Sequence, residues 1–121
     1  MRVLILDDDL ARHHLLGTWL DWKFGAEHVS LHSEYEKDGA IVALARQEFD
    51  LIYLDHDLGD GSRDASGAHV ARWLSEHPDS QRDAKIIVQS MNPPGAQRMM
   101  GWLADRPKAK AIPFAYLGLH A

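Results

Sequence analysis

The sequence predicts an α/β domain built on a doubly wound parallel sheet, and two observations support this prediction. Short, continuously apolar runs recur along the chain, as expected of strands that are buried on both faces. Segments with helical spacing of apolar residues separate these runs, so that strand and helix alternate four times. The chain has 121 residues, of which 45% are hydrophobic and 26% charged, and this suits a single domain over residues 1–121 with one core.

The first half of the chain contains two strand–helix units. Residues 3–6 form the first buried strand, and the acidic residues 7–9 close it. A helix is predicted over 10–24, with one aspartate of that acidic triplet as its N-cap. Apolar and polar residues alternate over 29–32, which indicates a second, more exposed strand. Residues 33–36 have the spacing of a capping box, so the second helix is expected to begin there.

The second half repeats the alternation. The third strand is predicted at 51–54 and the fourth at 86–88, both as continuous apolar runs. A third helix over 67–77 separates them. A fourth helix is predicted over 96–104, and Pro93-Pro94-Gly95 opens it, since proline suits a first helical turn. Residues 110–113 are a candidate fifth strand.

Polar residues follow three of the predicted strands at the point where each strand ends. They are Asp7-Asp8-Asp9, Asp55-His56-Asp57 and Gln89-Ser90-Met91-Asn92. Because the strands of a parallel sheet all point the same way, we expect these groups to meet at one edge. Several carboxylates in one crevice repel one another unless some stay protonated or a cation lies between them. Of these two explanations we choose the bound cation.

The residues available at this edge favour a hard metal ion. The chain has no cysteine, so the ligands are oxygen atoms, which suit Mg²⁺, with Mn²⁺ as the alternative. Such an ion typically bridges carboxylates to a phosphoryl oxygen. Ser90 and Asn92 could donate hydrogen bonds to the remaining oxygens. Phosphate chemistry is therefore the function that these residues favour.

Charge and composition exclude several other classes of function. A net charge of −5 disfavours duplex DNA as a partner, while leaving open a nucleotide or an RNA end in a metal-neutralised pocket. The apolar run near the N-terminus has only four residues, too few for a signal peptide or a membrane span. We therefore expect a cytoplasmic protein that does not bind membranes.

The order and spacing of the polar strand ends resemble those of response-regulator receiver domains along nearly the whole chain. The resemblance implies a flavodoxin-like fold with five strands in the order 2-1-3-4-5. It assigns Asp7, Asp8 and the backbone of Asp57 to a metal ion. It makes Asp55 the phosphoryl-accepting residue and places Ser90 against a phosphoryl oxygen.

Other positions both match and depart from the receiver pattern. Gly67 stands where receivers place a glycine before the third helix. Receivers carry a lysine before a proline at the end of the fifth strand, where this chain has Ile112 before Pro113. Residues 114–121 are too few for a full fifth helix, which is therefore expected to be truncated. The sheet would then need cover from this segment or from a second subunit, which would allow a homodimer.

A more divergent group matches the segments around the third and fourth strand ends. Leu-Asp-His-Asp-Leu at 54–58, and Ser-Met-Asn-Pro at 90–93 followed by Gly95, look like the cyclic-phosphate processing receiver domains. This resemblance implies action on RNA 2′,3′-cyclic ends or on cyclic nucleotides. Members often have a histidine before the serine, and this chain has Gln89 there.

On this resemblance we expect a metal-dependent phosphoesterase. Asp7, Asp8 and Asp55 would hold the ion, and a water molecule or Asp55 itself would attack phosphorus. His56 or His14 would protonate the departing ribose oxygen, since histidine titrates near neutrality. The expected substrate-binding residues are Arg12, Ser90 and Asn92.

Several alternatives remain open at this point. The chain could be a stand-alone receiver of a phosphorelay, phosphorylated on Asp55, or an interaction module without catalysis. Arg12 could pair with Asp9 at i, i+3 on one helix face instead of binding phosphate. One of His13 and His14 could line the rim of the crevice while the other is solvated, and the helical spacing does not decide which.

Overall fold

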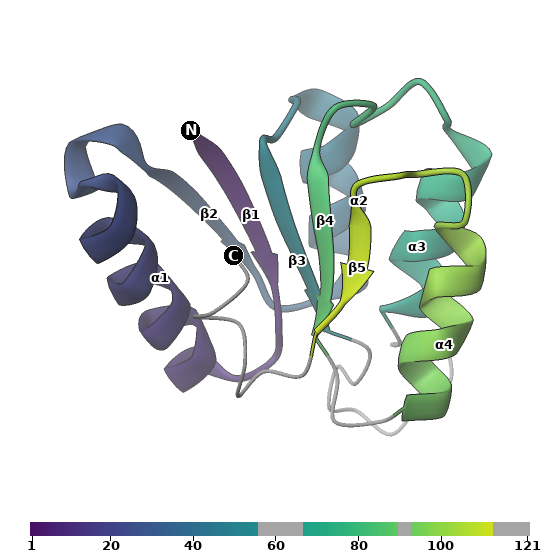
Figure 1. Ribbon diagram of the computed structural model, residues 1–121, viewed down its shortest axis with the longest axis horizontal. Helices are drawn as coiled ribbons and strands as arrows, with labels where there is room; N and C mark the ends of the chain where they lie inside the picture. The colour runs from purple at the N-terminus through teal and green to yellow at the C-terminus, as the bar shows by residue number, and fades with distance from the viewer. Residues whose placement is uncertain (56–66, 90–92, 113–121) are drawn as a thin grey trace.

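The described residues form a five-stranded parallel sheet with helices on both faces (Figure 1). The structure is a computed structural model, and it describes residues 1–55, 67–89 and 93–112. The strands lie in the order β2-β1-β3-β4-β5, which confirms the predicted order and doubly wound class. They are β1 (Arg2–Leu6), β2 (Ser30–Glu34), β3 (Leu51–Asp55), β4 (Lys85–Gln89) and β5 (Ala109–Ala111).

The helices divide unequally between the two faces of the sheet. Helix α1 (Leu10–Phe24) covers one face, and α2 (Lys37–Arg46), α3 (Ala68–Glu76) and α4 (Pro93–Trp102) cover the other (Figure 1). A short 3₁₀ turn, η1 (Ala26–His28), follows α1 and was not predicted. None of the helices in the described ranges combines the length and apolar composition that a membrane span requires.

Alternating residues of the central strands build two separate cores. In β3, Ile52 and Leu54 face α2, α3 and α4, whereas Leu51 and Tyr53 face α1. All four side chains are at most 4% exposed. This two-sided burial explains the continuous apolar runs in the sequence, since neither face of a central parallel strand meets water.

The predicted capping box at Ser33 and Glu36 is wrong. Ser33 belongs to β2, whose register pairs Ile5 with Ser33 and Leu6 with Glu34. The second helix begins at Lys37, and its N-cap Glu36 makes no side-chain capping hydrogen bond. Pairing with β1 therefore extends the strand through residues whose local sequence favours a helix start.

The C-terminal elements also differ from the prediction in their bounds. Helix α4 begins at Pro93, which confirms the predicted Pro-Pro-Gly opening, and it ends at Trp102, two residues before the predicted end. Strand β5 covers Ala109–Ala111, and Ile112 still donates its backbone N–H to Val88 at 2.9 Å. The predicted truncation of a fifth helix concerns residues that lie outside the described ranges.

Candidate functional site

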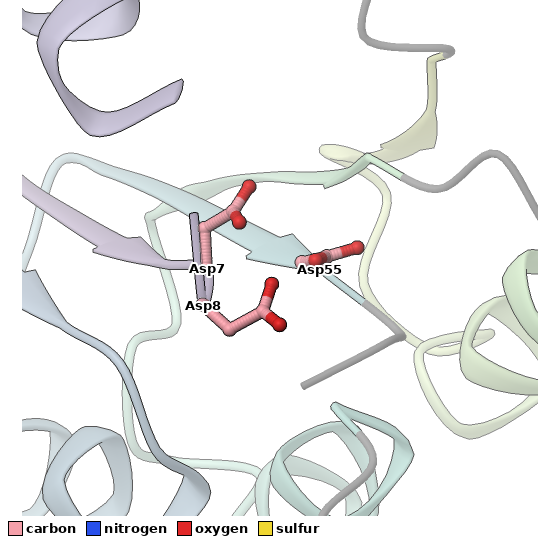
Figure 2. A group of neighbouring side chains, drawn as sticks. All are labelled: Asp7, Asp8 and Asp55. Atoms are coloured by element: carbon pink, nitrogen blue, oxygen red, sulfur yellow. The ribbon is translucent and has the colours of Figure 1, made fainter. Parts of the chain in front are cut away.

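Three carboxylates meet at the carboxyl edge of the sheet (Figure 2). Asp7 directly follows β1, Asp8 is the next residue, and Asp55 ends the neighbouring strand β3. One oxygen from each of the three lies within 4.8 Å of the others. Asp7 is completely buried, Asp55 is 5% exposed and Asp8 is exposed, so the group opens to solvent on one side. These hard oxygen donors fit a divalent metal ion.

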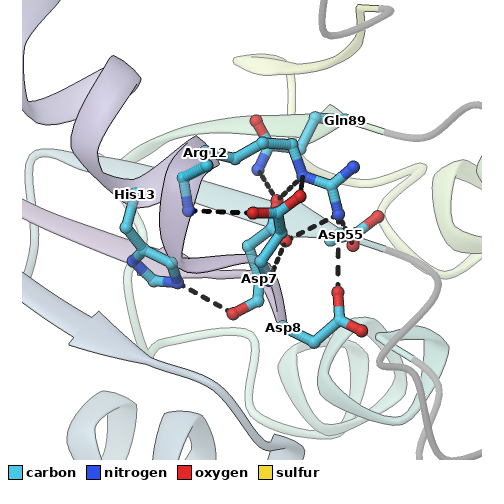
Figure 3. A network of polar contacts seen from close by, with 8 residues as sticks. Asp7, Asp8, Arg12, His13, Asp55 and Gln89 are labelled. Carbon is cyan, nitrogen blue, oxygen red and sulfur yellow. Dashed lines mark hydrogen bonds and ion pairs between the residues drawn. The ribbon is translucent and has the colours of Figure 1, made fainter.

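Arg12, on the first turn of α1, places its guanidinium among these carboxylates (Figure 3). Its Nε donates to Asp7 Oδ2 at 2.7 Å and its Nη2 to Asp7 Oδ1 at 2.8 Å, a bidentate pair. The same Nη2 lies 3.2 Å from Asp55 Oδ2 and 3.4 Å from Asp8 Oδ1. The pairing with Asp9 considered from the sequence is the longest of these contacts, at 4.0 Å.

Arg12 supplies a positive charge that the sequence lacks at the position of the receiver lysine. Ile112, which stands where receivers have a lysine, is 7% exposed and belongs to the apolar cluster on the α1 face. Arg12 reaches Asp55 from α1 instead of from the end of β5. A cation thus lies beside Asp55, and α1 supplies it instead of β5.

Gln89 is a member of the site that sequence reasoning gave no role. It ends β4 beside Asp55, is 2% exposed and donates from Nε2 to Asp7 Oδ2 at 3.1 Å. Its Oε1 is buried and has no hydrogen-bond partner among the described residues. Its position at a polar strand end could have placed Gln89 in the site from the sequence. No local sequence pattern, however, shows which carboxylate it contacts.

The structure also separates the two adjacent histidines. His13 is 4% exposed, and its Nε2–H donates to the main-chain oxygen of Asp7 at 2.8 Å. Its ring packs against Tyr35 with centroids 4.4 Å apart. His13 therefore fixes the backbone at the end of β1. His14 is exposed, and its proposed role as a proton donor stays a prediction.

Gly67 brings the start of α3 into direct contact with the end of β3. A Cβ atom at this position would lie 1.9 Å from the main-chain oxygen of Asp55 and 3.2 Å from Met99 Cε. The glycine has φ −58°, a conformation open to any residue. Glycine is therefore needed here because there is no space for a side chain. The glycine expected before the third helix thus lets α3 pack directly against the main chain of Asp55.

Burial and neighbouring charge alter the proton affinity of Asp8. Desolvation, followed by the charge of Asp7, raises the pKa of Asp8, and the charge of Arg12 partly opposes this. The hydrogen bond with Asp7 raises the pKa of Arg12, which stays charged. Asp8 therefore carries its negative charge in the folded protein less readily than in the unfolded chain.

Asp8→Asn is expected to stabilise the metal-free protein at neutral pH. A carboxyl with a raised folded pKa stabilises the fold below its unfolded pKa, about 3.9, and loses that contribution as pH rises through the folded pKa. The gain in melting temperature should therefore shrink at acidic pH, where wild-type Asp8 is protonated. Thermal unfolding with a chelator present, across this pH range, measures the effect. Asp105→Asn, which removes an exposed charge, is the control; an equal gain in both variants would contradict the prediction.

Four of the expected site residues lie outside the described ranges. They are His56, Asp57, Ser90 and Asn92. Their assigned roles in proton transfer, metal binding and substrate binding stay predictions.

Comparison with solved structures identifies the class to which this fold belongs. The response regulator protein from Burkholderia pseudomallei, whose structure has a phosphorylated aspartic acid, a calcium ion and citrate, is 22% identical, with a TM-score of 0.62. The match covers 93% of this chain, which spans 59% of that protein. The CheY-like receiver domain from Methylobacillus flagellatus is 15% identical, with a TM-score of 0.66 and coverage of 93% and 85%. The signal receiver domain of a DNA-binding response regulator from Colwellia psychrerythraea is 16% identical, with a TM-score of 0.71 and coverage of 98% and 93%.

The fold is therefore that of a response-regulator receiver domain. The family model of the cyclic-phosphate processing receiver domain matches residues 2–105, and the chain belongs to this family. Among curated protein sequences, none matches the chain.

Proposed function

We propose that this protein is a metal-dependent phosphoesterase that hydrolyses cyclic phosphates, either RNA 2′,3′-cyclic ends or cyclic nucleotides. The observation that carries the proposal is the cluster of Asp7, Asp8 and Asp55, within reach of one ion, in a chain of the cyclic-phosphate processing family. The calcium ion in the Burkholderia protein further supports a divalent ion in a fold of this kind. Mg²⁺ is the ion we propose, with Mn²⁺ as the alternative.

Each described residue has a defined part in this proposal. The three carboxylates would hold the ion, which when bound would neutralise the phosphodiester and polarise its phosphorus. Asp7 is fixed by its hydrogen bonds to Asp9 N and Gln89 Nε2, so its carboxylate is oriented in advance. The Arg12 side chain is 28% exposed, and its guanidinium could neutralise a phosphate oxygen.

The remaining roles come from residues predicted by the sequence. We assign His56 or His14 as the donor of the proton to the departing ribose oxygen. Ser90 and Asn92 would donate hydrogen bonds to the phosphate. A cyclic phosphodiester suits this set because ring opening needs one activated nucleophile, one proton donor and charge neutralisation on phosphorus.

Hydrolysis of a defined substrate panel tests the proposal. The purified protein is incubated with 2′,3′-cyclic nucleotides, 3′,5′-cyclic nucleotides and RNA ending in a 2′,3′-cyclic phosphate, with Mg²⁺ or Mn²⁺. We expect turnover of one substrate class that is lost on chelation and restored by the metal. The activity must co-elute with the protein on a sizing column, which excludes a contaminating nuclease.

Absence of hydrolysis would assign a different function to the protein. If no substrate is turned over, and beryllofluoride, a mimic of an aspartyl phosphate, binds in a manner that requires Asp55, the protein is a phosphoryl-accepting receiver. If neither occurs while the protein is folded, a non-catalytic interaction module remains.

A further inference from the structure

The buried carboxylate of Asp7 already has its full set of hydrogen-bond donors. Oδ1 accepts from Asp9 N at 2.8 Å and from Arg12 Nη2 at 2.8 Å. Oδ2 accepts from Arg12 Nε at 2.7 Å and from Gln89 Nε2 at 3.1 Å. A carboxylate has about four lone-pair directions in all. A metal ion can therefore be ligated by Asp7 only if at least one of these donors withdraws.

Arg12 is the donor that can withdraw. The N–H of Asp9 belongs to the backbone at the N-cap of α1, and Gln89 is 2% exposed and held in β4. The Arg12 side chain, in contrast, is 28% exposed and therefore has room to move toward solvent. It is also the only cation among the three donors, so a second cation beside Asp7 would repel it alone.

We propose that Arg12 is the resident counterion of this pocket and exchanges with the divalent ion, the two cations competing for Asp7. This inference rests on the proposed metal site and adds its regulation. In the metal-free protein Arg12 neutralises part of the charge of three clustered carboxylates and so stabilises the fold. When the ion is bound, Arg12 is released from Asp7 and its guanidinium becomes available to the phosphate of the substrate.

Arg12→Gln is expected to bind Mg²⁺ about tenfold more tightly than wild type, within the usual range of coupling between two sites. The same variant should have a lower melting temperature without metal, and Mg²⁺ should raise that temperature by more than it does in wild type. Titration calorimetry and thermal unfolding, with and without a chelator, measure both effects without any substrate. Arg46→Gln is the matched control, since Arg46 is exposed at the end of α2, on the opposite edge of the sheet.

Two further measurements keep the inference testable if Arg12→Gln folds poorly. Arg12→Lys retains the positive charge but cannot form the bidentate pair, so its Mg²⁺ affinity should lie between those of wild type and Arg12→Gln. In wild-type protein, the ¹⁵Nε–H resonance of Arg12 should shift as Mg²⁺ is added and should saturate together with the calorimetric binding curve.

The outcomes separate this inference from the proposed function. Mg²⁺ binding in Arg12→Gln that is no tighter than in wild type and Arg46→Gln would overturn the exchange, as would an Arg12 resonance that is unchanged at saturation. Absence of saturable Mg²⁺ binding in all variants would overturn it as well. Tighter binding in Arg12→Gln without hydrolysis of any cyclic phosphate would support the exchange and count against the phosphoesterase alone.

Discussion

Asp55→Asn is expected to lower the turnover of the cyclic-phosphate substrate by at least about a hundredfold, a loss typical of removing one group that stabilises charge in a site. Asp55, which is 5% exposed, ends β3 and is one of three carboxylates that could hold the ion. Asparagine keeps the shape but removes the charge and one oxygen, so it weakens the metal site. It also removes a nucleophile, if Asp55 attacks phosphorus directly.

The same substitution should leave the fold intact, and this distinguishes a catalytic loss from a structural one. The substitution loses the ion pair with Arg12 at 3.2 Å but relieves the repulsion from Asp7 and Asp8, so the melting temperature without metal should change little. Steady-state kinetics and thermal unfolding are measured together, with Asp83→Asn as the control. Asp83 is an exposed residue just before β4, at the opposite edge of the sheet. Full turnover in Asp55→Asn would exclude Asp55 from the reaction.

Gly67→Ala is expected to reduce the free energy of unfolding by about 3 kcal/mol, the upper part of the usual range for overpacking. The new methyl group would lie 1.9 Å from the main-chain oxygen of Asp55, far inside contact distance. That oxygen belongs to a buried strand and cannot rotate away, so α3 or the end of β3 must shift. Displacement of Asp55 should also weaken Mg²⁺ binding.

A second glycine provides the matched control for this substitution. Gly101 lies near the end of α4. Apart from the adjoining residues and the backbone of the helix itself, no atom of the described residues comes within 4 Å of the place that an added methyl group would take there. Alanine at this position should therefore be neutral or stabilise the fold by up to about 1 kcal/mol. Urea unfolding and Mg²⁺ titration of both variants measure the difference. Equal stabilities would show that the contact between Gly67 and Asp55 relaxes at little cost.

The sequence predicted the sheet and the clustering of its acidic ends well, because both depend on regular features. Buried parallel strands produce apolar runs, and parallel strands in the observed order place Asp7 beside Asp55. The identity of the carboxylate cluster followed directly from these two features. The glycine before the third helix was also found, although its contact with Asp55 was not.

The partners within the site could not be predicted in the same way. The contact of Arg12 with Asp7 depends on how the first turn of α1 is rotated over the sheet, and Asp9, three residues from Arg12, was the nearer candidate in sequence. The choice between His13 and His14 depends on the same rotation. The capping box failed for a related reason, since pairing of β2 with β1 outweighed the local preference of Ser33 and Glu36.

The first turn of α1 is attached to the end of β1 in two chemically different ways. Arg12 binds the side chain of Asp7, whereas His13 binds its main-chain oxygen. The exchange of Arg12 for a metal ion that we propose would break the first attachment and leave the second in place. His13 thus holds the helix to the strand while the adjacent Arg12 neutralises charge, so under this proposal the carboxylate cluster would change its cation while the helix keeps its position on the sheet.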